Sequence, residues 1–328
     1  MKKICYLLCL AALVACSPGP KPVSLIFDTD MAPDYDDVGA LAVLHALADS
    51  GEVNILATVS SNRTETAVPC IEVINTYFGR PDIPVGAVKD TTAPDLNTWH
   101  KGLRWTEELP AGYPHKTKST SDAEDAVKVY RQILSRQPDK SVVIATVGFF
   151  SNLKNLLQSP PDDISPLSGK DLVKAKVKQL VSMAAFFPEG REFNVMCDPK
   201  ASQVVFQQWP TPILLSGFEI GDKIITGKRL AADETIQNSP VKDAYDMCLA
   251  QDNPEGRNSW DQSTVLVAVR GVGDYYDTEK GELTVNDDGS NAWTPSETGK
   301  HARLIVKMPI EQTTRIIEDL MMHQPVKK

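Results

Sequence analysis

Short apolar runs rich in β-branched residues alternate along the chain with longer segments whose apolar positions recur at helical spacing. Val23–Phe27 is a run of the first kind and Val38–Leu47 a segment of the second, which predicts a strand, a loop and a helix in that order. The same pattern predicts further strands at Val53–Val59, Ile83–Ala87, Ser141–Val147, Gln179–Ala184, Ile213–Leu215 and near Leu304, and further helices at Glu65–Phe78, Ala123–Leu134, Ser151–Leu157, Ala201–Gln208, Val241–Ala250, Gln262–Val269 and up to Met321. Such alternation is typical of parallel strands with helices packed on the faces. The sequence therefore predicts an α/β fold with an open, mostly parallel, Rossmann-like sheet and flanking helices.

Three polar segments interrupt this alternation. Lys89–Ser121 is irregular, with aromatic residues and histidines interspersed. Unstructured stretches of that length are often functional, so we expect this segment to be a loop that borders the site. Ser159–Gly169 and the stretch around Asn286–Asn291 are rich in turn-forming residues.

The first residues have the pattern of an export signal. Lys2 and Lys3 precede an uncharged apolar run that is too short to span a bilayer as a helix but suits a signal peptide at residues 1–15. Leu13-Val14-Ala15-Cys16 resembles the lipobox of bacterial lipoproteins, in which the cysteine thiol carries the lipid. The alternative is an ordinary signal peptide that is cleaved nearby.

The lipobox resemblance implies a lipid-anchored, periplasmic protein with Cys16 as its mature N-terminus. Residues 16–22 contain too much proline and glycine for regular structure and suit a tether between the lipid and the domain. Residues 23–328 would then form one catalytic domain, because the α/β pattern continues without a linker.

Charge limits the classes of partner. The formal net charge is −9, and it becomes −11 when Lys2 and Lys3 are removed with the signal peptide. Contacts to nucleic-acid phosphates need clustered lysine and arginine, so no nucleic acid is expected as a partner. No apolar run after residue 22 is long enough to cross a bilayer, so we expect membrane contact only through the N-terminal lipid.

Five aspartates follow the first predicted strand within ten residues, at Asp28, Asp30, Asp34, Asp36 and Asp37. In a parallel α/β sheet this is where the ligand crevice lies. Mutual repulsion would raise the pKa values of these carboxyl groups unless a cation neutralises them, and a hard ion with oxygen ligands, such as Ca²⁺, is the natural solution. One or two of them could instead cap the following helix.

A phosphatase is the competing interpretation of the first two aspartates. Asp28-Thr29-Asp30 after a strand resembles the haloacid-dehalogenase phosphatases, which are Mg²⁺-dependent and use the first aspartate as a nucleophile. The continuation Asp34-Tyr35-Asp36-Asp37 is not required by that family.

The whole string from Asp28 to Leu41 resembles the signature of the inosine–uridine-type nucleoside hydrolases, here with a turn that is two residues longer and includes Asp34. Four later segments match the same family in its order, so that the resemblance covers about residues 23–322. They are Val59–Asn62, Val147–Leu153, Glu192–Asn194 with Asp198-Pro199, and Trp260-Asp261. Taken singly, each has an ordinary alternative as a turn residue, a helix cap or a solvated surface charge.

The resemblance implies roles for individual residues. Asp30, Asp37, Asp261 and the backbone carbonyl of Val147 would hold Ca²⁺, and Asp30 would also act as the general base that takes a proton from the attacking water. The residues that would bind ribose hydroxyls are Asp36, Asn62, Glu192 and Asn194. Trp260 stands where many members have a histidine, and it could stack on the nucleobase or simply pack.

The expected activity is Ca²⁺-dependent hydrolysis of the N-glycosidic bond of ribonucleosides or close analogues to free base and ribose, which would serve purine and pyrimidine salvage. A catalytically weak nucleoside- or sugar-binding lipoprotein is the remaining alternative. Phe186-Phe187-Pro188 departs from the family, because many members have a sugar-contacting asparagine there, and His100 is a weak candidate to replace it. The nucleobase and the oligomeric state, including a homo-oligomer, stay open.

Overall fold

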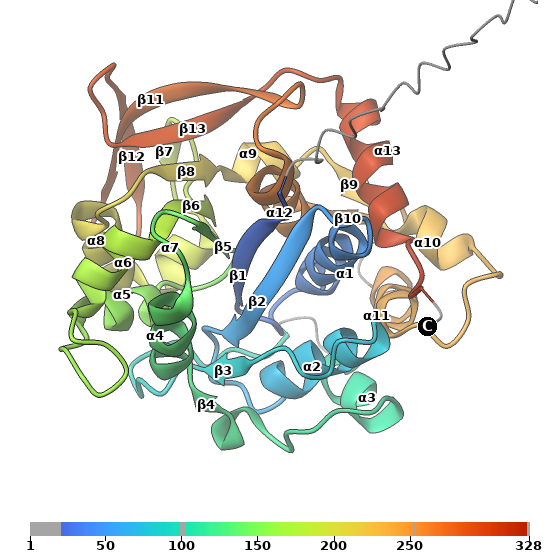
Figure 1. The fold of residues 1–328 in the computed structure, drawn as a ribbon. Helices are drawn as coiled ribbons and strands as arrows, with labels where there is room; N and C mark the ends of the chain where they lie inside the picture. The colour runs from blue at the N-terminus through green and yellow to red at the C-terminus, as the bar shows by residue number, and fades with distance from the viewer. Residues whose placement is uncertain (1–20, 99–102, 252, 327–328) are drawn as a thin grey trace, which may run out of the picture.

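One sheet runs through the centre of the protein, and helices cover both of its faces (Figure 1). The computed structural model describes residues 21–98, 103–251 and 253–326. The predicted signal peptide, Cys16 and His100 therefore lie outside the described residues. In order across the sheet, the strands are β4 (Glu124–Asp125), β3 (Val85–Ala87), β2 (Val53–Ser60), β1 (Val23–Thr29), β5 (Val142–Thr146), β6 (Val177–Met183), β8 (Ile213–Ser216), β13 (His301–Val306), β11 (Tyr276–Val285), β12 (Asn291–Pro295) and β7 (Glu189–Gly190).

The parallel part of this sheet extends from β4 to β13, with β1 inside it. β1 pairs in parallel with β2 on one side and with β5 on the other. The strand order therefore reverses between β1 and β5, and in open α/β sheets ligands bind outside the carboxyl ends of the strands at such a switch point. The predicted α/β fold with a mostly parallel sheet is confirmed.

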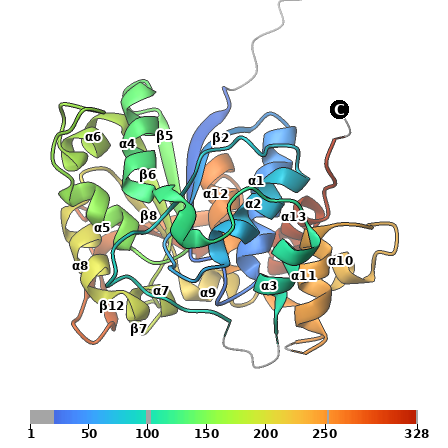
Figure 2. The same ribbon diagram turned by 90° about the horizontal axis from the view of Figure 1, so that it is seen from below.

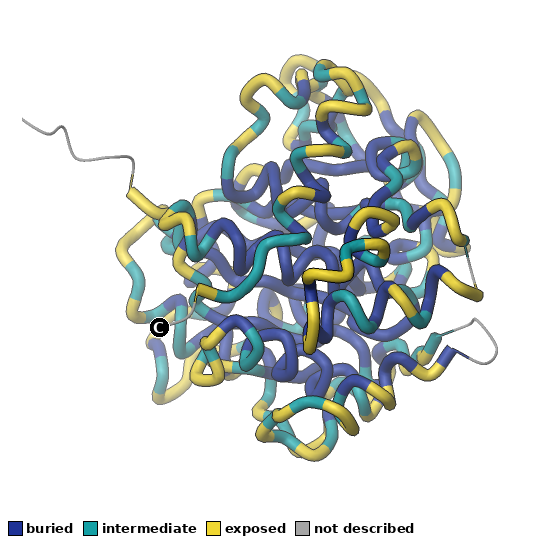
Figure 3. The backbone as a smooth tube through the Cα atoms, turned by 90° about the vertical axis from the view of Figure 1, so that its right-hand side faces the viewer, coloured by how far each residue is buried: buried dark blue, intermediate teal, exposed yellow. Residues whose placement is uncertain are grey.

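Two hydrophobic cores, one on each face of the sheet, hold the longer helices (Figure 2). The helices over the first core are α1 (Asp36–Asp49), α2 (Ala67–Tyr77), α3 (Trp105–Gly112), α11 (Pro240–Leu249), α12 (Trp260–Arg270) and α13 (Ile310–Met321). The helices over the second core are α4 (Ala126–Arg136), α5 (Ser151–Gln158), α6 (Gly169–Lys176) and α8 (Pro199–Gln208). Figure 3 shows the buried backbone gathered in the interior and the exposed stretches at the periphery. None of the helices within the described ranges has both the length and the apolar character that crossing a membrane requires.

An antiparallel edge that the sequence did not predict extends the sheet beyond β13. β11 pairs antiparallel with both β13 and β12, and β7 completes the edge. The turn-rich stretch at Asn286–Asn291 lies at the tip of the β11–β12 hairpin. Charged residues of β11, such as Asp277 and Lys280, are exposed between its few buried positions, so no continuous apolar pattern marks this strand.

The segment 89–121 is more ordered than expected. Within it, α3 buries Trp105 and Leu109 in the first core, and the 3-10 helix η1 (Thr120–Asp122) follows. The Glu72 carboxylate accepts hydrogen bonds from the backbone N–H groups of Lys116 at 2.8 Å and Thr117 at 2.6 Å. The prediction of an irregular loop is therefore wrong for this part, because buried aromatic and aliphatic side chains fix it to the body of the protein.

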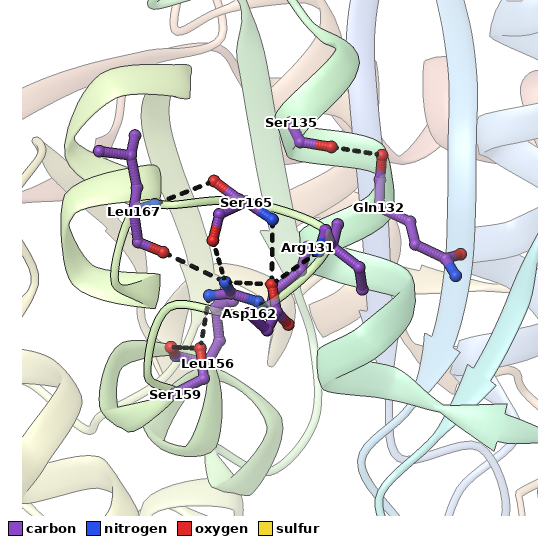
Figure 4. A network of polar contacts seen from close by, with 9 residues as sticks. Arg131, Gln132, Ser135, Leu156, Ser159, Asp162, Ser165 and Leu167 are labelled. Carbon is purple, nitrogen blue, oxygen red and sulfur yellow. Dashed lines mark hydrogen bonds and ion pairs between the residues drawn. The ribbon is translucent and has the colours of Figure 1, made fainter.

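A buried arginine orders the turn-rich loop at Ser159–Gly169 (Figure 4). The Arg131 guanidinium donates to both carboxylate oxygens of Asp162 at 2.7 Å and to the carbonyl oxygens of Ser165 and Leu167. A two-pronged contact of this kind fixes orientation as well as distance. The loop leads into α6, a short and largely polar helix that the sequence did not predict and that Ser168 caps.

Candidate active site

The ends of β1, β2 and β5 meet at the switch point of the sheet. The N–H of Ser61 donates to the carbonyl of Thr29, and the N–H of Val147 donates to the carbonyl of Asp28, both at 2.8 Å. A Cβ added to Gly148 would lie 2.3 Å from the backbone nitrogen of Asp30. The turn after β5 therefore approaches the loop after β1 as closely as only a glycine permits.

A cavity of about 350 Å³ opens at this point. Its described lining residues are Asp30, Pro33, Asp34, Asp36, Asp37, Val147, Met183, Glu192, Phe193, Asn194, Phe218, Arg257, Trp260 and Asp261. Eight of the nine residues that we expected to hold the metal and the substrate are among them; the exception is Asn62. Segments spread from the first strand to the helix α12 are thus brought to one place.

The carboxylates of two helix N-termini converge in this cavity. Asp36 and Asp37 stand in the first turn of α1, and Asp261 stands in the first turn of α12. One oxygen from each of these three side chains lies within 4.8 Å of the other two, and all three residues are buried. The backbone N–H of Asp261 also hydrogen-bonds to the Asp36 carboxylate.

These carboxylates destabilise one another's charge. Burial, and then the charge of Asp37, raises the pKa of Asp30 well above its usual value. Burial and the neighbouring charges of Asp36 and Asp37 do the same to the pKa of Asp261. A set of buried, mutually repelling oxygen donors suits a hard divalent cation, which would restore the ionised forms.

Thr29 fixes the orientation of Asp37. Its hydroxyl donates to the Asp37 carboxylate and accepts a hydrogen bond from the N–H of Met31 at 3.0 Å. Our sequence analysis assigned no role to Thr29. Its only signal there was its position between two aspartates at the end of a strand.

Asp28 does not line the cavity. Its carboxylate is fully buried and accepts hydrogen bonds from the Tyr130 hydroxyl at 2.9 Å and from the side-chain amide of Asn152. Burial raises its pKa to about 7 despite these donors. A phosphatase of the type considered above would need this aspartate as its nucleophile, so the phosphatase interpretation is not favoured.

Glu192 is a buried helix cap and not a solvated surface charge. Its carboxylate accepts hydrogen bonds from the backbone N–H groups of Asn194 at 2.8 Å, and of Val195 and Ala185 at 3.2 Å each. Burial raises its pKa to about 7. The side-chain amide of Asn194 donates to the carbonyl of Val147 at 2.9 Å, so these three lining residues form one connected group.

Asn62 lies behind the cavity. Its amide nitrogen donates to the carbonyl oxygens of Asp30 and Leu96, and its amide oxygen accepts from the N–H groups of Leu96 and Thr64. These contacts use both hydrogens of the side chain. In this structure Asn62 therefore ties the loop after β1 to the segment around Leu96 instead of facing the cavity.

Asp34 and Arg257 form an ion pair that our sequence analysis missed. An Arg257 guanidinium nitrogen lies 2.5 Å from an Asp34 carboxylate oxygen. Arg257 lies in β10 (Arg257–Asn258), which pairs antiparallel with β9 (Ile225–Thr226) just before α12. The extra carboxylate of the longer turn is thus matched by a cation more than 200 residues later in the sequence.

Trp260 is held against this pair and against a neighbouring phenylalanine. The Arg257 guanidinium carbon lies 5.0 Å from the centre of a Trp260 ring. The centres of the Phe218 and Trp260 rings are 5.1 Å apart, and the ring planes are inclined by 35°. The indole N–H of Trp260 donates to the carbonyl of Phe218 at 2.7 Å. The ring is therefore fixed in place with its polar hydrogen already used.

Comparisons with known proteins show the family to which the chain belongs. The family model described as inosine-uridine preferring nucleoside hydrolase matches residues 25–314. The pyrimidine-specific ribonucleoside hydrolase RihA of Citrobacter koseri is 28% identical over 213 residues, and that of Salmonella agona is 30% identical over the same length. Each match covers 61% of this chain and 61% of the relative, so the chain spans less than two thirds of the curated relatives' length.

Solved structures show the same fold. The plant nucleoside hydrolase PpNRh1 superposes with a TM-score of 0.70 at 18% sequence identity, covering 92% of this chain and 99% of that one. The inosine-uridine preferring nucleoside hydrolase of Bacillus anthracis gives a TM-score of 0.68 at 16% identity and covers 92% and 99%. Because the family model spans most of the chain, the protein belongs to the inosine-uridine preferring nucleoside hydrolase family.

Proposed function

We propose that this protein hydrolyses the N-glycosidic bond of ribonucleosides or close analogues, and that it requires Ca²⁺. The observation that carries the proposal is that a buried carboxylate cluster, Glu192 and Asn194 line one and the same cavity. Cleavage of this bond passes through an oxocarbenium-like ribosyl cation, so the enzyme must supply a nucleophilic water and hold the sugar. Carboxylates and an amide that line one cavity meet both needs.

Asp37 and Asp261, from the cluster of three carboxylates, would hold the ion. The family resemblance adds Asp30 and the carbonyl of Val147, which line the same cavity but are not part of that cluster. When bound, Ca²⁺ would supply positive charge that makes a water more acidic and attracts the oxygens of a diol. Asp30 would take the proton of the attacking water as general base.

The remaining polar residues of the cavity would position the sugar. Asp36 and Glu192 can accept hydrogen bonds from ribose hydroxyls, and backbone N–H groups already hold the Glu192 carboxylate in place. Asn194 can accept through its amide oxygen while its nitrogen contacts Val147. A sugar held by fixed groups presents its anomeric carbon to the water in one orientation. Trp260 would lie against the nucleobase.

We further propose that the protein is exported and anchored in a membrane by a lipid on Cys16, because the leader and the lipobox-like segment precede the fold. The nucleobase is not fixed by the similarities. The curated relatives are called pyrimidine-specific, whereas one similar structure is called an inosine-guanosine nucleoside hydrolase. Both purine and pyrimidine ribonucleosides therefore belong in the assay.

The test is release of ribose by the chain begun at Val23 from a panel of ribonucleosides, with Ca²⁺ or with a chelator. We expect Ca²⁺-dependent release that Asp30→Asn lowers by at least about 10²-fold, as removal of a general base does. Asp277→Asn, an exposed aspartate of β11, serves as the matched control. Phosphate release from a generic phosphate ester without ribose release would refute the proposal, and tight nucleoside binding without turnover would favour the binding-protein alternative.

A further inference from the structure

We propose that Arg257, held in position by Asp34 and Trp260, stabilises the nucleobase as it leaves. This inference rests on the proposed function and adds to it the group that acts on the leaving side of the bond. When the N-glycosidic bond breaks, its electron pair stays on the nitrogen of the base, so negative charge develops there. A side chain near the base must offset that charge or donate a proton.

Few of the described lining residues can offset negative charge on the base or donate a hydrogen bond to it. Three of them carry nitrogen donors on their side chains, namely Asn194, Trp260 and Arg257, whereas the lining carboxyl groups are assigned to the ion and the sugar. The amide hydrogens of Asn194 are directed to the Val147 carbonyl and the Met183 carbonyl, and the indole N–H of Trp260 is bound to the Phe218 carbonyl. Arg257 is the one cation among the described lining residues.

Two aromatic rings and two carboxylates hold the guanidinium group of Arg257 in place. Its carbon lies 5.4 Å from the centre of the Tyr35 ring and 5.0 Å from that of Trp260. Asp34 pairs with it at 2.5 Å, and only 12% of the Arg257 side chain is exposed. An Asp36 carboxylate oxygen lies 3.8 Å from the Arg257 Nε, so two carboxylates hold it. A cation fixed in this way by aromatic rings and carboxylates loses little freedom when it meets a ligand.

An arginine acts here by charge and hydrogen bonding and not by giving up its proton, because its pKa stays above about 12 in proteins. The base would therefore leave as an anion paired with the guanidinium. The water oxygen forms the new bond to the anomeric carbon, Asp30 takes the water proton, and the base is protonated by solvent after release. Atoms and charge balance without a second acid.

The pair Asp34–Arg257 also explains why the cavity tolerates an extra carboxylate. The charge of the Asp34 carboxylate is matched by the guanidinium nitrogen 2.5 Å away. Its partner lies on the side of the aromatic residues Phe218 and Trp260. Asp34 is therefore a positioning residue for Arg257.

The experiment uses the full chain with Ca²⁺ and compares two kinds of substrate. Inosine and uridine have poor leaving groups, whereas p-nitrophenyl β-D-ribofuranoside releases a phenolate that needs little stabilisation. We expect Arg257→Gln to lower kcat on the nucleosides by about 10²-fold, the loss typical of one preorganised donor at a developing anion, and on the nitrophenyl riboside by less than about tenfold. KM should change little for either.

Two further variants sharpen the test. Arg257→Lys keeps the charge and should recover part of the nucleoside rate, and Asp34→Asn should show the same substrate dependence with a smaller loss. Arg303→Gln is the matched control, because Arg303 also lies over two aromatic rings and pairs with Glu279, but outside the cavity. It should leave both rates unchanged.

Equal losses on the two kinds of substrate, or no loss, would overturn the role of Arg257 while the ribohydrolase assignment stands. If Arg257→Gln does not fold, as judged by thermal unfolding, the same comparison with Arg257→Lys decides. Failure of the unaltered protein to release ribose from any substrate would overturn the proposed function and this inference with it.

Discussion

Gly148→Ala is the substitution that most directly tests how closely the strand ends must approach. The added methyl carbon would lie 2.3 Å from the backbone nitrogen of Asp30 and 2.7 Å from its Cβ. Ordinary contacts begin near 3.4 Å, so the turn after β5 and the loop after β1 must separate by about 1 Å. Overpacking of this kind costs about 1–3 kcal/mol, and a displacement of about 1 Å at reacting groups costs about 10²-fold in rate.

The assay combines ribose release with urea unfolding. We expect Gly148→Ala to lose about 10²-fold in kcat while it remains folded at neutral pH. Gly112→Ala is the control, because Gly112 lies at the end of α3 and an added Cβ there meets nothing within 4 Å. It should keep full activity and gain up to about 1 kcal/mol of stability. Full activity of Gly148→Ala would refute the claim that this approach positions Asp30.

Three further predictions concern pH, substrate charge and the ion. Burial lowers the pKa of His45 to about 3, so the folded state binds no proton there while the unfolded state does below pH 6.5, and stability falls as pH falls from 6.5 towards 3. Between pH 7.5 and pH 4.5 the unaltered protein should lose about 3 kcal/mol of unfolding free energy through this group, and His45→Gln should not. Urea unfolding at both pH values measures the difference in stability between the two proteins, and a difference that does not change with pH would contradict the prediction. The lining residues that the structure describes include six carboxylates and one arginine, so nucleoside 5′-monophosphates should be hydrolysed at least about tenfold more slowly than nucleosides. Competition assays measure this, and equal rates would show that the carboxylates do not select against a negatively charged substrate. Ca²⁺ at a hundred times its dissociation constant should raise the free energy of unfolding by about 2.7 kcal/mol, seen as a higher Tm that a chelator reverses, and an unchanged Tm would argue against ion binding.

The central part of the fold was predictable because its signals are local. β5 is buried along its whole length, and β1 is buried and apolar from Leu25 to Phe27. The aspartates at the end of β1 and after it fall where an open sheet binds its ligands. In the edge hairpin β11–β12, buried positions alternate only over the short stretch from Gly281 to Val285, and the first half of β11 carries exposed charged side chains, so the apolar signal is weak. The order in the segment around α3 depends on contacts such as that of Glu72 with Lys116, which are remote in sequence.

The candidate site divides in the same way. Residues in the acidic motif could be placed from the sequence, whereas Arg257 could not, because a single arginine in a polar stretch has no feature that ties it to Asp34. Asn62 shows that a residue can be correctly placed near the site while the direction of its side chain is not predicted. Its position after β2 fits a sugar contact, but the direction of its side chain depends on the segment at Leu96, and there it serves the backbone.

The meeting of α1 and α12 at the carboxylate cluster would couple the retention of the proposed ion to the cooperative unfolding of the whole domain. Asp37 lies early in the chain and Asp261 late, so the loop between them must close before both can contribute a ligand. Any partial unfolding that detaches α12 would remove Asp261 and leave only the aspartates near the N-terminus of α1 to bind the ion. The dissociation rate of the ion should therefore track the slow amide hydrogen exchange of α12 and not the motion of surface loops.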